Sequence, residues 1–260
     1  MMAEAIARGL VKAGVASENI IISDPVQARR EHLDSALGIK AVEENKEVRD
    51  FADVIILAVK PAIAHDAIAD IADDMPVGKL IISIVAGVTT DSILTQLSGE
   101  IPVVRAMPNS PCLIGEGAIA VAPGKYATRD HVGIACEIFS ATGLVVTVTE
   151  DKMDVVTGLS GSGPAYVYAF IEALADGGLR MGLPKLTAIL LAAQTVAGSA
   201  RMVLETKEHL SQLRDHVMTP GGTTVEGMYI LESSGFKGAV MEAVKAATDK
   251  ATALGKPKSG

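Results

Sequence analysis

The sequence predicts an α/β domain followed by an all-α domain. Residues 54–59, 80–84 and 103–105 are short apolar stretches, and helical patterns separate them. Strands that are apolar on both sides belong to parallel sheets whose two faces are covered by helices. After residue 151 no stretch has the pattern of a strand. We therefore expect a doubly wound, Rossmann-type parallel sheet in residues 1–149 and helices in residues 150–260.

The elements of the first half follow from the alternation of apolar patterns. Met2, Ile6 and Leu10 have helical spacing, which predicts a helix over residues 1–12. We expect strands at residues 19–23, 39–42, 54–59, 80–84, 103–105, 119–121 and 144–148, and further helices at residues 26–37, 43–49, 62–72, 91–97 and 127–141.

The second half has three long helical patterns. The first begins at Pro164, which suits the first position of a helix, and ends near residue 181. The second runs from Pro184 to about residue 205, and the last covers residues 236–254. Because the second of these helices is apolar on more than one face, it needs more covering surface than a domain of this size supplies. We expect self-association through this half, and a substrate site at the boundary of the two halves.

The start of the sequence lacks one expected element. A dinucleotide-binding sheet begins with a strand and a Gly-rich turn that holds the pyrophosphate at the N-terminus of the first helix. This sequence opens inside that helix, so we expect the first strand to be missing through truncation or a misplaced start. Neighbouring strands would then carry unpaired backbone groups, each costing roughly 1–3 kcal/mol where buried.

Charge and composition exclude several classes of function. A net charge of −8 and a pI of about 5.2 argue against a nucleic-acid partner. Cys112 and Cys136 lack metal-ligand spacing, so we expect both to be packing residues and predict no metal site. The apolar stretches at residues 80–88 and 186–200 are too short or too interrupted to span a bilayer, and the N-terminus has no secretory leader. The sequence therefore predicts a cytoplasmic protein without a membrane segment.

Polar residues follow the predicted strands of the first half. Ligands of doubly wound sheets bind outside the carboxyl ends of the strands. This rule places Ser23, Asp24, residues 58–61, residues 84–87 and Asn109 around one crevice of a size that fits a dinucleotide.

A second candidate site lies in the loop at residues 219–224, Thr-Pro-Gly-Gly-Thr-Thr. The loop runs into a helical pattern, and backbone N–H groups at a helix start bind small anions. The alternative is an ordinary helix start, capped by Thr219 or Thr223, with glycine allowing a tight turn. The pattern alone leaves both interpretations open.

Four motifs in order resemble pyrroline-5-carboxylate reductase over nearly the whole chain. They are Val-Arg-Ala-Met-Pro-Asn-Ser-Pro at 104–111, Leu-Ser-Gly-Ser-Gly-Pro-Ala-Tyr at 159–166, Gln-Thr-Val-Ala-Gly at 194–198, and Leu-Arg-Asp with Thr-Pro-Gly-Gly-Thr-Thr at 213–224. The resemblance implies NAD(P)H-dependent reduction of 1-pyrroline-5-carboxylate to L-proline. It also implies a helical dimerisation domain, and often a ring of dimers such as a decamer.

The resemblance also implies roles for individual residues. Residues 2–5 match the segment after the family's Gly-rich turn, which makes Met2 a cofactor residue and leads us to expect weaker cofactor binding where that turn is lacking. The family positions that line the cofactor cleft correspond to Asp24, Asn45, Ala58, Val59, Lys60, Pro61, Ile84, Val85 and Ala86. Asn45 has an equally good interpretation as a cap-like residue at a helix start.

The cofactor choice stays open between NADP and NAD. Asp24 favours the ribose 2′-hydroxyl of NAD, whereas Ser23, Arg29 and Arg30 could accept the 2′-phosphate of NADP. For the substrate, the resemblance implies that the backbone at Gly221, Gly222, Thr223 and Thr224 binds the carboxylate and that the Thr224 hydroxyl hydrogen-bonds the ring nitrogen. Family members often have Ser where this chain has Thr219, which keeps the hydroxyl and its role.

The absence of an obvious general base agrees with an imine substrate. A protonated imine is already electrophilic, so positioning and one hydrogen bond suffice. Residues 160–170 contain no Lys, His, Asp or Glu. His216 lies near the loop as a proton donor, but a lone histidine is more often structural. Two alternatives remain: another nicotinamide-dependent imine or hydroxyacid oxidoreductase, and a non-catalytic oligomeric binding protein.

Overall fold

The computed structural model describes residues 2–255, which form two compact units. The first unit comprises the residues up to Ser162 together with those from Lys245 onward, and the second comprises Gly163–Val244. The expected boundary at residue 149 therefore falls inside the first unit. The physical reason is packing, because Met153 is fully buried against Met107 and other residues of the first unit. Each unit is described by itself below.

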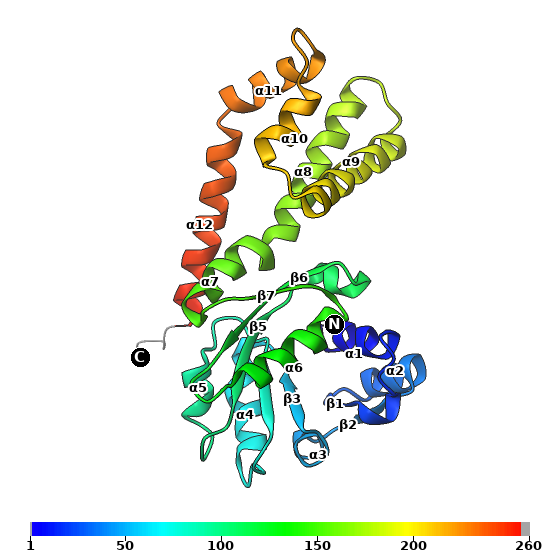
Figure 1. Cartoon of the computed structure of the whole chain (residues 1–260). Helices are drawn as coiled ribbons and strands as arrows, with labels where there is room; N and C mark the ends of the chain where they lie inside the picture. The colour runs from blue at the N-terminus through cyan, green and yellow to red at the C-terminus, as the bar shows by residue number, and fades with distance from the viewer. Residues whose placement is uncertain (1, 256–260) are drawn as a thin grey trace. The chain divides into compact units, whose positions relative to one another are not determined.

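The first unit contains seven strands and the helices that cover them (Figure 1). The strands are β1 (Ile21–Ser23), β2 (Lys40–Val42), β3 (Val54–Leu57), β4 (Leu80–Ser83), β5 (Val103–Met107), β6 (Gly117–Pro123) and β7 (Gly143–Thr147). The α-helices are α1 (Met2–Lys12), α2 (Gln27–Leu37), α3 (Asn45–Phe51), α4 (Ala64–Ala72), α5 (Thr90–Leu94), α6 (Arg129–Ser140) and α7 (Met153–Val156). A π-helical turn, Thr157–Gly161, follows α7. Each expected strand and helix of this half is present with shifted ends.

The strands form two separate sheets. β1 pairs in parallel with β2 alone, and β3 begins a five-stranded sheet of order β3-β4-β5-β6-β7. Within the described residues, no strand hydrogen-bonds to the free edge of β1 or to that of β3. One further strand pairing with both edges would give the strand order common in dinucleotide-binding sheets. The sheet is thus divided where the sequence predicted a missing central strand.

The larger sheet is mixed rather than wholly parallel. β3, β4 and β5 are parallel, and β6 and β7 are parallel to each other, but β6 runs antiparallel to β5. The reason is the connection, since only the short helix Ser110–Ile114 and a few loop residues separate β5 from β6. A parallel pair needs a crossover of a dozen or more residues. α6 supplies that crossover between β6 and β7.

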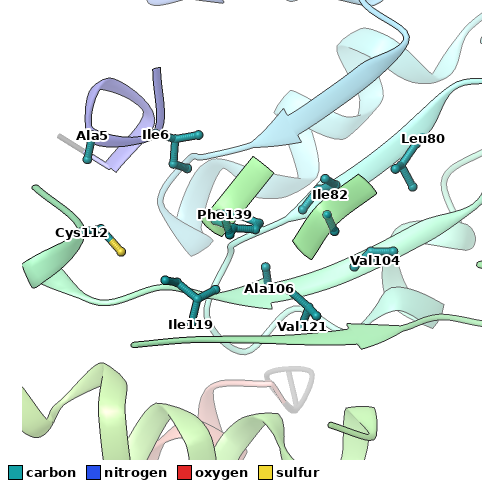
Figure 2. Close-up of a cluster of buried hydrophobic side chains, with 11 residues drawn as sticks. Ala5, Ile6, Leu80, Ile82, Val104, Ala106, Cys112, Ile119, Val121 and Phe139 are labelled. Carbon is teal, nitrogen blue, oxygen red and sulfur yellow. The ribbon is translucent and has the colours of Figure 1, made fainter. Parts of the chain in front are cut away.

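Helices cover both faces of the larger sheet. On one face, side chains from α1 and α6 pack on β4, β5 and β6, with Phe139 of α6 fully buried among Ile82, Ala106 and Ile119 (Figure 2). On the other face, residues of α4 and α5 pack on Ile81 and Val103. Adjacent strand residues therefore point to opposite cores. This is the doubly wound arrangement that the apolar strands predicted.

α1 is also shared by two cores. Ala5 and Ile6 belong to the cluster under α6, whereas Ala7 packs with Leu33 and Ile39 on the smaller sheet. Cys112 is buried in the first of these clusters and Cys136 packs against it, and neither thiol forms a disulfide. The prediction that both cysteines are packing residues is confirmed.

The second unit is helical (Figure 1). Its helices are α8 (Gly163–Arg180), α9 (Lys185–Thr206), α10 (Leu210–Val217), α11 (Thr223–Ser233) and the first part of α12 (Phe236–Leu254). α8 and α9 pack through Ala175, Ala188 and Ala192, and α8 meets α12 where the rings of Phe170 and Phe236 lie 5.8 Å apart. In the described chain beyond residue 147 there is no strand, as expected.

Large apolar side chains of the second unit remain exposed. In α9, Leu186 and Leu190 are 76% and 71% exposed, and an open apolar pocket of about 160 Å³ lies beside Leu183 and Leu191. By length and mean hydropathy alone, the 22-residue helix α9 could cross a membrane, whereas the sequence prediction counted the polar residues of this stretch as interruptions. The same exposure fits a helix that is covered when copies of the chain associate.

Candidate functional site

Ser23 and Asp24 lie at the carboxyl end of β1 in a network of hydrogen bonds. Asp24 accepts from the backbone N–H of Val26 at 3.0 Å and from Nε of Arg29 at 2.9 Å. Arg30 donates to the carbonyl oxygen of Asp24 at 2.8 Å. Ser23 donates to Oδ1 of Asn45 at 2.7 Å. The structure thus brings together two of the predicted cofactor residues from β1 with a third from α3.

Asn45 does not cap its helix. It is the first residue of α3, the residue before it is Glu44, and no side chain caps this helix. Its amide instead accepts from Ser23 and donates to Asp70 of α4 at 2.9 Å. The cap-like alternative for Asn45 is therefore wrong, and its side chain faces the polar cluster at the end of β1.

The predicted residues after β3 and β4 lie at the carboxyl ends of adjacent parallel strands. Residues 58–61 follow β3, and Lys60 and Pro61 are exposed there. Residues 84–86 follow β4, where the N–H of Ile84 donates to the carbonyl of Leu57. The side chain of Val85 is buried in the core, so this residue can meet a ligand only through its backbone. Lys60 is the one exposed cation among the described residues of these two loops.

Asn109 and Met2 are used in packing. Nδ2 of Asn109 donates to the carbonyl of Ser160 at 3.0 Å, and Oδ1 accepts from the N–H of Ala118 at 2.9 Å. The residue is buried, so its side chain ties the start of β6 to the π-helical turn. Met2 packs against the cluster under α6.

The loop of residues 219–224 forms the start of α11. Its residues are exposed or half-buried, and the N-cap is Gly222, with no side-chain cap bond. Neither Thr219 nor Thr223 therefore caps the helix, so the expected threonine cap is wrong. The N–H groups of Thr223 and Thr224 have no acceptor among the described residues, because the first donors of a helix have no partner within it.

Both glycines of this loop are required by its geometry. Gly221 has φ +71°, in the left-handed region that favours glycine. The N–H of Gly222 donates to the carbonyl of Thr219 at 2.9 Å, and a Cβ on Gly222 would collide with Oγ1 of Thr219. The turn thus leaves the first N–H groups of α11 without a partner among the described residues, with Oγ1 of Thr219 beside Gly222. This arrangement suits a small carboxylate, which the positive end of the helix dipole attracts.

His216 and its charged neighbours make local contacts. His216 is exposed and lies 3.7 Å from Glu208, away from the start of α11 along the chain. Across residues 2–255 no group of three His, Cys, Asp or Glu side chains could hold a metal ion. Arg214 and Asp215 form the local ion pair expected of neighbours, at 3.9 Å.

One buried cluster was missed by sequence reasoning. Arg105 of β5 is almost completely buried and lies 3.5 Å from Asp154 and 3.8 Å from Glu150. Glu150 accepts from both the N–H and the hydroxyl of Thr90. The only sequence signal is the charge itself, since an arginine inside an apolar strand needs a buried partner. The contacts of Arg105 hold residues 150–154 on the sheet.

The fold and these sites define a dinucleotide-dependent oxidoreductase with a separate helical unit. Comparison with known proteins supports this class. Residues 150–254 match the family model for pyrroline-5-carboxylate reductase dimerisation, and residues 1–87 match the model for NADP oxidoreductase, coenzyme F420-dependent. A pyrroline-5-carboxylate reductase of Synechocystis is 44% identical over 257 residues, which cover 98% of this chain and 96% of the relative.

Solved structures give the same result. A pyrroline-5-carboxylate reductase from Coxiella burnetii is 36% identical with a TM-score of 0.91, covering 98% of this chain and 96% of that one. The Plasmodium falciparum pyrroline carboxylate reductase, solved with NADP bound, is 35% identical with a TM-score of 0.87, covering 98% and 95%. The chain belongs to the pyrroline-5-carboxylate reductase family.

Proposed function

We propose that this chain reduces 1-pyrroline-5-carboxylate to L-proline with NADPH or NADH, the last step of proline biosynthesis. Family membership and the uncapped start of α11 support the proposal. The bound cofactor would supply a hydride for the carbon of the protonated C=N bond, where the hydride's electron pair would form the new C–H bond while the π electrons of the C=N bond became the nitrogen lone pair. The product is a secondary amine, and no base is needed to remove a proton from the substrate.

The substrate residues would be those of the loop before α11. We assign the substrate carboxylate to the backbone at Gly221, Gly222, Thr223 and Thr224, because the N–H groups of Thr223 and Thr224 have no other described acceptor. The Thr224 hydroxyl would hydrogen-bond the ring nitrogen and orient the imine. Thr219 would supply a second hydroxyl beside the carboxylate. Thr224 and Thr219 are thus the proposed catalytic residues.

The cofactor residues would be those at the strand ends of the first unit. We assign Ser23, Asp24 and Asn45 to the ribose, because their polar groups meet at the end of β1. Lys60 is an exposed cation suited to a phosphate group, and the backbone at Ala58, Val59, Pro61, Ile84, Val85 and Ala86 would line the cleft. Met2, the first residue of α1, would also be a cofactor residue. Asn109 would act as a positioning residue, since its amide is already bonded to Ser160 and Ala118.

The assembly and the location of the protein are also proposals. We propose a homodimer formed through the helical half, residues 150–260, and a ring of dimers such as a decamer, with residues 1–149 as the cofactor domain. The exposed leucines of α9 and the dimerisation family match support self-association. Two free thiols agree with a cytoplasmic enzyme, because thiols stay reduced there.

Loss of NADH or NADPH in the presence of 1-pyrroline-5-carboxylate tests the proposal. Thr224→Ala is expected to lower kcat by roughly 10- to 100-fold, the worth of one hydrogen bond to a charged group. Thr224→Ser should recover most of the rate because it keeps the hydroxyl, and Ser233→Ala, which removes an exposed hydroxyl at the far end of the same helix, is the control. An unchanged rate for Thr224→Ala would remove Thr224 from the mechanism.

Two results would favour the alternatives. Faster turnover with another cyclic imine or with a hydroxyacid would point to a different oxidoreductase of the same architecture. A well-folded protein that oxidises neither nucleotide with any of these substrates would be a non-catalytic binding protein.

A further inference from the structure

The end of α12 contacts the loop that follows β4. A Cβ on Gly87 would lie 3.2 Å from the backbone nitrogen of Gly255, and a Cβ on Gly255 would lie 2.8 Å from the carbonyl oxygen of Gly87. Both belong to the first unit, although they lie near opposite ends of the chain. The two backbones therefore touch directly, and neither glycine has room for a side chain unless the other moves.

Gly87 belongs to a tight turn at the carboxyl end of β4. The N–H of Val88 bonds to the carbonyl of Val85 at 3.4 Å, and Gly87 has φ +76°. A left-handed residue at the third position of a turn favours glycine. The turn carries residues 84–86, and β4 pairs in parallel with β3 and β5. Ligands of such sheets bind at this edge.

The end of α12 is anchored to the first unit by two further contacts. Ala251 is buried, and the hydroxyl of Thr252 donates to Oδ2 of Asp154 at 2.9 Å. Figure 1 shows α12 ending beside α7, the helix that carries Asp154. Oδ1 of Asp154 lies 3.5 Å from the buried Arg105 of β5. The last turn of α12 is thus fixed to the sheet that carries the turn at Gly87.

The same charged cluster holds both ends of that turn. Arg105 lies opposite Ser83 in the pairing of β5 with β4, and the N–H of Val85 donates to Oγ of Ser83 at 3.3 Å. Glu150, the second carboxylate beside Arg105, accepts from the N–H and the hydroxyl of Thr90. The turn is therefore fixed at its start and at its end, and Gly255 contacts its middle.

We propose that the end of α12 is a positioning element for the cofactor. The contact of Gly255 with Gly87 and the bond from Thr252 to Asp154 hold the turn where the backbone of residues 84–86 meets the nucleotide. Gly255 and Thr252 act through the turn and do not touch the cofactor. This inference rests on the proposed function, in which residues 84–86 line the cofactor cleft, but nucleotide binding reports on it without turnover.

The experiment uses two variants of the full chain that change no residue assigned to cofactor or substrate. Gly255→Ala adds a Cβ against Gly87, and its matched control is Gly238→Ala in α12, where a Cβ has open space among the described residues. Thr252→Val removes the hydroxyl, and its control is Thr252→Ser, which keeps the donor.

Four measurements are made on each variant. Nucleotide fluorescence gives Kd for NADH and NADPH, and steady-state kinetics give kcat and the KM of each substrate. Hydrogen exchange follows the backbone N–H of Val88, whose bond to Val85 closes the turn. Thermal melting followed by circular dichroism reports the stability of the fold.

Gly255→Ala and Thr252→Val should raise Kd and KM for both nucleotides by roughly threefold or more, because small displacements of binding groups are costly. The N–H of Val88 should exchange faster in both. The kcat at saturating nucleotide and the KM for 1-pyrroline-5-carboxylate should be unchanged. Gly238→Ala and Thr252→Ser should keep the Kd of the parent.

A lower Tm with unchanged Kd in Gly255→Ala and Thr252→Val would show a merely structural role and overturn the proposal. An equal rise in Kd for Gly238→Ala or Thr252→Ser would also overturn it. If Gly255→Ala does not fold, the comparison of Thr252→Val with Thr252→Ser decides.

The outcomes also separate this inference from the proposed function. Turnover with unchanged Kd values overturns the role of α12 and leaves the reductase in place. Raised Kd values in a chain that binds nucleotide without turnover support the role of α12 and refute the reductase. Binding of neither nucleotide by the folded parent chain overturns both.

Discussion

The side-chain amide of Asn109 donates to the backbone carbonyl of Ser160 across 3.0 Å, although 51 positions separate the two residues in sequence. The same amide accepts from the N–H of Ala118, so one buried side chain satisfies two backbone groups.

Asn109→Ala should cost roughly 2–4 kcal/mol in the free energy of unfolding, because each unsatisfied buried group costs about 1–3 kcal/mol. Urea unfolding measures this. Ser110→Ala, at the exposed neighbour, is the control, and a loss for Asn109→Ala no larger than the control's would contradict the role.

Gly222→Ala should disturb substrate binding more than folding. The added Cβ would collide with Oγ1 of Thr219, so the turn before α11 must shift. We expect KM for 1-pyrroline-5-carboxylate to rise about tenfold or more, since small misplacements of a binding group are costly. Steady-state kinetics measure KM. Gly227→Ala in the same helix has open space and should leave KM unchanged while adding about 0.5–1 kcal/mol of stability. Equal KM values in both variants would rule out the proposed carboxylate site.

Leu190→Glu should weaken self-association. Leu190 is 71% exposed in α9, and a carboxylate at a covered apolar surface has no partner there. Light scattering after size-exclusion chromatography should show a smaller particle than for the parent protein. Val77→Glu makes the same chemical change at a fully exposed residue of the first unit and should leave the particle size unchanged. An unaltered assembly in Leu190→Glu would place the interface elsewhere.

The open edges of β1 and β3 predict the effect of an added strand. A segment of β-branched residues and a Gly-rich turn fused before residue 2 could pair with both edges and complete the cofactor loop. We expect a higher Tm and a lower Kd for NADH and NADPH than in the parent chain. A Gly/Ser extension of equal length is the control. If the parent chain proves as stable and binds both nucleotides as tightly as the extended one, the expectation of a missing strand is wrong.

Glu4 predicts a change of stability in acid. Its carboxylate lies 3.1 Å from both His32 and Arg8. The hydrogen bond from His32 has the largest effect and lowers the pKa of Glu4 below its ordinary value, desolvation comes next and raises it, and the hydrogen bond from Arg8 lowers it further. A carboxylate whose pKa is lowered in the folded state stabilises that state at pH values above its unfolded-state pKa. This contribution is lost as the pH falls through the folded-state pKa. Glu4→Gln should therefore lower Tm near neutral pH, by an amount equivalent to about 1 kcal/mol or less. The difference from the parent should shrink below pH 4.5. A difference that grows in acid would contradict this assignment.

Local sequence predicted most of the fold because burial leaves a local pattern. The apolar residues of β4 and β5 are buried on both faces, and those of β3 are buried on one face and partly buried on the other, so each strand was visible by itself. The direction of β6 could not be predicted from the sequence, because strand direction depends on the path of the connection and not on the composition of the strand. The domain boundary likewise shifted because Met153 packs on distant residues.

The candidate sites were predictable to different degrees. The turn at Gly221 and Gly222 has a local cause, and its glycines were identified from the loop sequence. The partners of Asn109 and Arg105 lie far along the chain, so only the fold reveals them. The same holds for Ser23, whose hydroxyl is linked to Asp70 of α4 through the amide of Asn45.

The two cysteines lie at different depths of one core. Cys112 is 3% exposed beneath α1 and β6, whereas Cys136 sits at the rim of the same cluster in α6. A thiol reagent can reach Cys112 only when that part of the first unit opens, while Cys136 needs a smaller fluctuation. The rates at which the two sulfur atoms are alkylated therefore report, without any engineered label, how often the nucleotide-binding unit opens globally and how often it only frays.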